Sequence, residues 1–302
     1  MAAVQPLPRS QFRIGYTVQQ EWAWLITCAF FFGTVGGGLF FVSYVADFDL
    51  GAAVALLIVG VGKTTAHLLF LGKPLRAWRA VFAWRTSWIS RGVVAMSVFL
   101  ACGFVSVLPY FGVSGLEGAA GVFGWIAAGA AVVLMVYDGF VLKTSGGIPL
   151  WSSWLMPLLT LSYALLGGVA LTLVLEVIAG DEVTGSAVEL LEVALLAANL
   201  VLVGVYVYSA PIRSAAAGFA ARMLTRGPRG RVFLLGAVGI GLVATLAFAI
   251  VAVSTGSDAA LTLAAATDLA GHFAMFFLIL RAGVYEPPRP LSLPGVPAAG
   301  RA

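Results

Sequence analysis

Eight stretches of this chain are each long and apolar enough to cross a lipid bilayer, and this repetition constrains the fold most strongly. A spanning helix needs about 20 apolar residues. Because lipid offers no partners for backbone N–H and C=O groups, such stretches must form helices that pair these groups internally. We predict an all-α integral membrane protein with eight transmembrane helices at residues 22–46, 50–71, 88–110, 120–142, 151–178, 187–210, 231–254 and 260–282.

The composition agrees with a chain that meets lipid along most of its length. Hydrophobic residues make up 61% of the 302 residues and charged residues only 10%, whereas a soluble domain carries about 25% charged residues. Cys28 and Cys102 lie in apolar stretches and show no disulfide or metal-ligand spacing. Since the cations lie beside apolar stretches, the net charge of +4 does not indicate nucleic-acid binding.

The predicted helices divide the chain into three parts. We expect an N-terminal segment at residues 1–21, a membrane domain at 22–284 arranged as two four-helix bundles, and an irregular tail at 285–302 that is rich in proline and small residues. The first 21 residues are mostly polar, so we expect no cleavable signal peptide.

Lysine and arginine residues gather at one end of the predicted helices, which we call the arginine face. All of them except Lys63 lie near the termini or in the loops after the second, fourth and sixth spans. We call the opposite end the acidic face, because its loops contain aspartate and glutamate but no lysine or arginine. Positive charge collects on the cytoplasmic side, so both termini are predicted to be cytoplasmic. The arginine face could also be a docking surface for a partner.

Two ionisable residues lie within predicted spans at similar depth. Lys63 precedes Pro74 by 11 residues and Asp138 precedes Pro149 by 11 residues, and both prolines follow their spans at the arginine face. A lone Lys or Asp at the centre of a membrane helix costs roughly 2.5–3.5 kcal/mol. We therefore predict an ion pair between Lys63 and Asp138, whose role could be structural only.

Other polar residues approach the arginine face near this pair. His67 lies one turn above Lys63 on the same side of its helix, Tyr137 precedes Asp138, and Gln20 and Glu21 lie at the start of the first span. In the last span, Asp268 and His272 are four residues apart and form a second polar spot, for which we expect a hydrogen bond between helices.

The histidine count limits the redox chemistry available to the chain. A bis-histidine haem takes two histidines, and the sequence holds only His67 and His272. We therefore expect no haem and no other metal site. If the chain takes part in electron transfer, a partner must carry the metal centres.

Four segments together resemble the NrfD/PsrC/DmsC-like membrane subunits of molybdopterin oxidoreductases, such as polysulfide and dimethyl sulfoxide reductases. The most specific segment, residues 67–92, looks like the L-G-x-P loop of that family followed by its S-W-[LI]-S-R element. The segment at residues 136–151 contains the family's Y-x-G tyrosine, which is Tyr137 here. The four segments are EWAWLITCAFFFGTVGGG (21–38), HLLFLGKPLRAWRAVFAWRTSWISRG (67–92), VYDGFVLKTSGGIPLW (136–151) and DLAGHFAMFFLILRAGVY (268–285).

The resemblance implies an eight-helix subunit without haem in a bacterial inner membrane. It exchanges electrons with menaquinone or ubiquinone, which binds as a substrate, through residues of about 22–142. Its implied partners are a ferredoxin-like iron–sulfur subunit and a molybdopterin catalytic subunit. Because the expected docking loop lies at the arginine face, we place the partner on the cytoplasmic side. The expected docking residues are Gly72, Pro74, Arg76, Arg79 and Arg85.

A quinone needs an apolar groove, a hydrogen-bond donor near its carbonyl oxygens and a source of protons. Histidine and tyrosine can donate hydrogen bonds, and histidine titrates near neutrality. Gln20 or Glu21 could pass protons to bulk water. The expected quinone-site residues are Gln20, Glu21, Lys63, His67, Tyr137 and Asp138.

Two other functions are compatible with the sequence, and we assign no catalytic residue. The chain could be a proton- or ion-translocating transporter in which Lys63, Asp138, Asp268 and His272 line a relay. It could also be a membrane anchor without quinone chemistry. A transporter works alone, whereas a quinone-interacting chain should copurify with an iron–sulfur protein.

Overall fold

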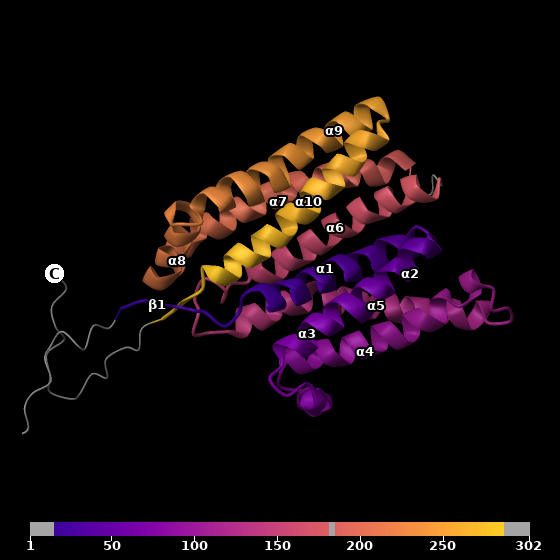
Figure 1. Cartoon of the computed structure of the whole chain (residues 1–302), viewed down its shortest axis with the longest axis horizontal. Coiled ribbons are helices and arrows are strands. Elements are labelled where there is room, and N and C mark those ends of the chain that lie inside the picture. Colours follow the sequence, from indigo (N-terminus) through magenta and orange to yellow (C-terminus); the bar gives the residue numbers. More distant parts are fainter. Residues whose placement is uncertain (1–14, 181–184, 287–302) are drawn as a thin grey trace, which may run out of the picture.

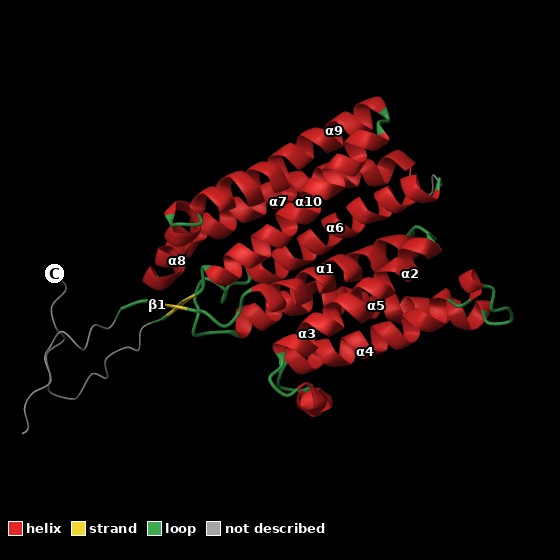
Figure 2. Cartoon of the chain, viewed as in Figure 1, coloured by secondary structure: helices red, strands yellow, loops and turns green. Residues whose placement is uncertain are grey.

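The computed structural model describes residues 15–180 and 185–286, and this part of the chain is almost entirely helical (Figure 2). Eight of its helices are long and apolar enough to cross a membrane, which confirms the prediction of an all-α membrane protein. The predicted tail at 285–302 lies outside the described residues after Glu286. The eight spans are Trp24–Val45, Asp49–Phe70, Trp88–Val107, Glu117–Thr144, Leu155–Ala179, Ala187–Arg213, Val232–Thr255 and Asp258–Arg281.

Six spans are single α-helices and two are composite. The single helices are α1 (Trp24–Val45), α4 (Trp88–Val107), α5 (Glu117–Thr144), α6 (Leu155–Ala179), α7 (Gly185–Arg213) and α10 (Asp258–Arg281). The second span runs through α2 (Asp49–Leu57), η2 (Ile58–Lys63) and α3 (Thr64–Phe70), and the seventh through η5 (Val232–Ala244) and α9 (Thr245–Thr255).

The segments η2 and η5 are π-helical, with wider turns than an α-helix. A threonine follows each one and returns its hydroxyl to a carbonyl five residues earlier. Thr64 Oγ1 lies 3.2 Å from the oxygen of Val59, and Thr245 Oγ1 lies 3.1 Å from that of Ile240. Each of these carbonyls also accepts a backbone N–H bond at the end of its π-helical segment, so the hydroxyl adds a second bond to the same oxygen. Wide turns of this kind occur frequently at functional sites, and η2 ends at Lys63.

Helix α1 runs through the middle of the molecule and is the most buried of the eight spans (Figure 1). It packs on α2, α5, α6 and α10. Gly38 lets α1 cross α6 closely, since a Cβ atom there would overlap the carbonyl oxygen of Ala164. The predicted division into two four-helix bundles stays a prediction, because α1 packs on α6 as closely as on its own neighbours.

The first and last described segments are bound together at the arginine face. Strand β1 (Thr17–Val18) pairs antiparallel with β2 (Val284–Tyr285) (Figure 1). Just after β1, the side chain of Gln19 donates a 2.6 Å hydrogen bond to the carbonyl of Leu280 at the end of α10. We call β1, β2 and Gln19 the terminal clasp.

Three short helices lie outside the spans. The 3₁₀ segment η4 (Pro109–Phe111) follows α4 at the acidic face. At the arginine face, the 3₁₀ segment η3 (Pro74–Ala83) follows the second span, and α8 (Ala215–Arg226) follows α7. The hydroxyl of Ser214 caps α8 by accepting a 3.0 Å bond from the amide of Ala217. The side of α8 that carries Ala216, Ala217 and Leu224 is buried, whereas no residue of η3 is buried.

Candidate functional site

A cavity of about 590 Å³ opens near the arginine face. Its wall comes from the end of the second span, from η3, from the first turns of α4 and from Tyr137 of α5. The volume lies within the 300–1,000 Å³ typical of small-molecule sites, which are mainly apolar with a few polar groups. The polar and charged residues in the wall are Lys63, Thr64, His67, Lys73, Arg76, Ser97 and Tyr137.

The ammonium group of Lys63 forms the inner end of this cavity. Its Nζ atom lies 3.3 Å from Oδ2 of Asp138 and donates a 2.9 Å hydrogen bond to the carbonyl of Ala29 on α1. Lys63 is 1% exposed and Asp138 is fully buried. Gly33 makes room for the ammonium group, because a Cβ atom there would overlap Nζ. The ion pair predicted from sequence is confirmed.

His67 and Tyr137 meet beside the ion pair. Tyr137 Oη lies 3.3 Å from Nε2 of His67, and His67 Nδ1 lies 3.2 Å from the carbonyl oxygen of Lys63. A carbonyl only accepts, so Nδ1 carries the proton and Nε2 is the acceptor for the tyrosine hydroxyl. The Lys63 ammonium also lies 4.6 Å from the centre of the Tyr137 ring, within cation–π range.

Gly92 of α4 supports the position of Tyr137, although the sequence pattern did not indicate it as a site residue. A Cβ atom on Gly92 would overlap the ring of Tyr137. The glycine therefore lets the ring lie directly on the backbone of α4. The only available sequence signal was a small residue one position after Ser90-Arg91.

The five residues expected to dock a partner lie together on the loop between the second and third spans. Gly72, Pro74, Arg76, Arg79 and Arg85 are all exposed, and Arg76 also lines the cavity. Arg91 fixes the end of this loop by donating hydrogen bonds to the carbonyls of Trp84 (3.1 Å) and Arg85 (2.9 Å). The loop thus places a cationic surface over the cavity.

The structure does not bring Gln20 and Glu21 to the cavity. Both are exposed at the entry to α1 and neither lines the cavity wall. The backbone carbonyl of Gln20 accepts a 3.4 Å hydrogen bond from Arg281. The neighbouring Gln19 is the buried residue of this segment, and its side chain belongs to the terminal clasp.

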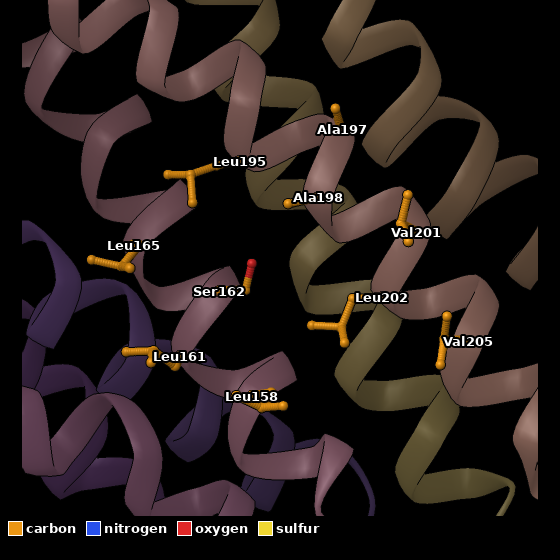
Figure 3. Close-up of a pocket in the computed structure, with 10 residues that line it drawn as sticks. All are labelled: Leu158, Leu161, Ser162, Leu165, Leu195, Ala197, Ala198, Val201, Leu202 and Val205. Atoms are coloured by element: carbon orange, nitrogen blue, oxygen red, sulfur yellow. The ribbon is translucent and has the colours of Figure 1, made fainter.

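A second groove, of about 640 Å³, lies between α6 and α7 and has a different chemical character (Figure 3). Nine of its ten labelled side chains are leucine, valine or alanine, and Ser162 is the one polar member. Leu158 and Val201, at its rim, are more than half exposed. Such a surface suits lipid chains and offers no groups for acid–base or redox chemistry.

The polar spot expected in the last span extends further than the sequence indicated. The predicted hydrogen bond between helices is confirmed for His272, whose Nε2 lies 3.2 Å from Oγ1 of Thr34 on α1. Neither carboxylate oxygen of Asp268 has a hydrogen-bond partner within the described part of the chain. Glu192 and Asn199 of α7 are also buried, which the sequence pattern did not indicate. In the sequence they are visible only as an isolated acidic residue and an isolated amide within an otherwise apolar span.

Comparisons with known proteins match almost the whole chain to one family. Residues 14–288 match the family model described as "Polysulphide reductase, NrfD". A segment of 52 residues is 48% identical to a sulfite dehydrogenase subunit of Allochromatium vinosum and covers 17% of this chain and 15% of that relative. Because the family match covers far more than half of its length, the chain belongs to the polysulphide reductase NrfD family of membrane proteins.

Proposed function

We propose that this chain is the quinone-interacting membrane subunit of a molybdopterin and iron–sulfur oxidoreductase. It exchanges electrons between menaquinone or ubiquinone and an iron–sulfur subunit. The observation that carries this proposal is the cavity of about 590 Å³. His67 and Tyr137 lie together in its largely apolar wall, next to the buried ion pair of Lys63 and Asp138. Membership of the NrfD family supports the same function.

The side chains of the cavity suit the chemistry of a quinone. The Met96, Ile89 and Val93 side chains of α4 give the cavity an apolar wall for a ring. The Tyr137 hydroxyl, which donates its one proton to Nε2 of His67 in this structure, would turn to donate it to a carbonyl oxygen of a bound quinone. Nε2 of His67, released from that bond, can accept a proton from a quinol hydroxyl and return it in the reverse reaction. Two-electron reduction of a quinone to a quinol takes up two protons, so a proton-transferring group next to the ring is required.

The loop over the cavity suits a partner that holds the metal centres. Arg76, Arg79 and Arg85 present positive charge and are exposed, and Trp78 and Trp84 lie among them. Arginine and aromatic residues are enriched at protein interfaces. We infer that a ferredoxin-like iron–sulfur subunit docks here, with the molybdopterin catalytic subunit beyond it, on the cytoplasmic side of a bacterial inner membrane.

Substitution of the two polar cavity residues tests the proposal in the assembled complex. Tyr137→Phe and His67→Gln each remove one proton-transferring group and keep the size of the side chain. We expect quinol-linked turnover of the purified complex to fall roughly 100-fold or more. Turnover with a viologen dye, which meets the catalytic subunit directly, is expected to stay unchanged.

Tyr208→Phe is the matched control, because Tyr208 is a highly exposed tyrosine of α7 outside the cavity wall. This variant should keep both activities. Normal quinol turnover in Tyr137→Phe and His67→Gln would reject the quinone site and favour a simple membrane anchor. Ion flux through vesicles that contain this chain alone would favour a transporter.

A further inference from the structure

Asp268 is a carboxylic acid ten residues into the last span, and no described residue forms an ion pair with it. It is fully buried, and neither of its oxygens has a hydrogen-bond partner among the residues that the structure describes. Along the whole sequence from α6 to α10, every arginine lies at the arginine face and no lysine occurs. An isolated buried carboxylate is costly enough that it takes up a proton or binds a cation.

Further polar groups surround Asp268, and several of them also lack partners. Tyr163 lies on α6, which packs on α10, and Glu192 lies on α7, which packs on α6 and α9; both side chains are buried. His272, one turn along α10, has its ring centre 4.9 Å from that of Tyr163. The Tyr163 hydroxyl, Nδ1 of His272 and Oε1 of Glu192 are buried without a hydrogen-bond partner in the described ranges.

Helices α1 and α9 and segment η5, which also pack on α10, contribute no charged side chain to the described part of the chain near Asp268. Thr34 of α1 bonds to His272, and Thr245 of α9 bonds at 2.8 Å to Thr267, the residue before Asp268. The glycines at positions 241 and 271 bring η5 and α10 into direct backbone contact. Segments η5 and α9 carry no acid or base at all. The titratable groups on the helices around Asp268 are therefore His272, Tyr163 and Glu192, together with Glu176, which is buried near the acidic end of α6.

These groups lie at increasing depth from the acidic face. Glu192 is seven residues from the start of α7 at Gly185, about 11 Å at the helical rise of about 1.5 Å per residue. Asp268 is ten residues from the start of α10 at Asp258, about 15 Å deep. His272 follows one turn deeper and contacts α1 at Thr34. Thr34 directly follows Gly33, which packs on Lys63.

We propose that Asp268 and Glu192 form a proton-binding site in the second half of the molecule, and that the site exchanges protons with water at the acidic face. Glu192 lies between Asp268 and that face and relays the proton. The site is separate from the quinone cavity at the arginine face and does not rest on the proposed quinone function.

Carbodiimide labelling of the complete complex in sealed vesicles tests this proposal without any substitution. Dicyclohexylcarbodiimide is apolar, and a protonated carboxylic acid adds across its C=N bond to give an O-acylisourea. In a site without water or another nucleophile, the acyl group then shifts from oxygen to nitrogen and gives a stable N-acylurea. We expect mass spectrometry to find this adduct on Asp268. Labelling should fall when the pH is raised on the side of the acidic face and stay constant when it is raised on the side of the arginine face. Asp258, which is exposed, should remain unlabelled.

Two variants test the relay. Glu192→Gln should slow the response of Asp268 labelling to the external pH. Asp258→Asn, which removes an exposed acid from the first turn of α10, should leave that response unchanged. Absence of label on Asp268 would overturn the proposal, as would labelling that follows the pH at the arginine face. Protection of Asp268 by sodium ions would show a metal-cation site and would overturn it too. Because the label needs no quinone, these outcomes do not depend on quinol turnover.

Discussion

Lys63 shows how a single residue inside the membrane determines its surroundings. Its ammonium group is neutralised by Asp138, bonded to the carbonyl of Ala29 and accommodated by Gly33. It also lies against the ring of Tyr137, which reaches His67. Three helices therefore take their local side-chain arrangement from one cation.

Replacing one partner of this ion pair should lower the free energy of unfolding more than replacing both partners. Lys63→Met leaves Asp138 as an unpaired buried charge, and we expect a loss of about 3–5 kcal/mol in the free energy of unfolding. Lys63→Met combined with Asp138→Asn should lose less, because neither charge remains. Lys73→Met, which replaces an exposed lysine, is the control. Thermal unfolding in detergent measures all three, and equal losses in the single and double variants would contradict the ion-pair interpretation.

Gly92 offers a test of how strictly Tyr137 must be positioned. Gly92→Ala places a methyl group where the ring now lies, so the hydroxyl moves away from His67. We expect quinol-linked turnover to fall about 10- to 100-fold while the complex still assembles. Gly129→Ala, in an open position of α5, should keep full turnover. A fully active Gly92→Ala complex would show that the hydroxyl position does not limit the reaction.

Residue patterns predicted the centre of the candidate site but not its periphery. Lys63 and Asp138 were paired correctly because each is expensive in lipid and both lie at one depth. Gln20 and Glu21 were expected beside them because they share the same end of the bundle, but sequence does not give the direction of a side chain in an entry loop. The buried Glu192 and the ring-supporting Gly92 depend on contacts between spans that lie far apart in sequence.

Among the helices, close packing depends on glycine at the crossing points. Apolar side chains gain little from leaving lipid for another helix, so membrane helices associate through tight backbone contact at small residues. The α1–α6 crossing shows this, because Gly38 and Gly168 bring the two backbones together. This contact connects the half of the molecule that holds the cavity to the half that holds Asp268.

Gly38→Ala should therefore weaken the whole bundle. The added methyl group meets a backbone carbonyl, that of Ala164, which cannot rotate away. We expect the free energy of unfolding to fall by about 1–3 kcal/mol or more. Gly204→Ala, at a position of α7 with no atom near the added methyl group, is the control. Equal thermal unfolding midpoints for both variants would show that the crossing tolerates separation.

Sequence predicted the spans well because each one is set by its own residues. The eight apolar stretches match the eight observed helices to within a few residues at most ends. The π-helical segments η2 and η5 were not predicted, since their composition does not differ from that of a regular apolar helix.

For the molecule as a whole, the two ends of the bundle carry opposite charge. The arginine face holds the cavity, its cationic loop, α8 and the terminal clasp. The acidic face lies nearer to Glu192 and Asp268. The proposed quinone site and the proposed proton site therefore open toward opposite sides of the membrane.

The charge distribution predicts which end faces the cytoplasm. With its arginine residues inside, the chain should place residue 302 and the loop around Arg222 in the cytoplasm. Fusing alkaline phosphatase, which is active only in the periplasm, after residue 302 should give an inactive reporter. A fusion in the loop near Gly115, at the acidic face, should be active. The reverse pattern would place the docking loop and its partner outside the cytoplasm.

The terminal clasp has a consequence for biosynthesis. Gln19 is synthesised before the eight spans, but its partners follow only at the end of the last of them, since it bonds to the carbonyls of Leu280 and Gly283. Until the ribosome has passed α10, strand β1 cannot pair with β2. A messenger cut short before the final span would thus yield a product with exposed, unpaired backbone at β1, which membrane proteases could recognise and remove before it displaced an intact copy.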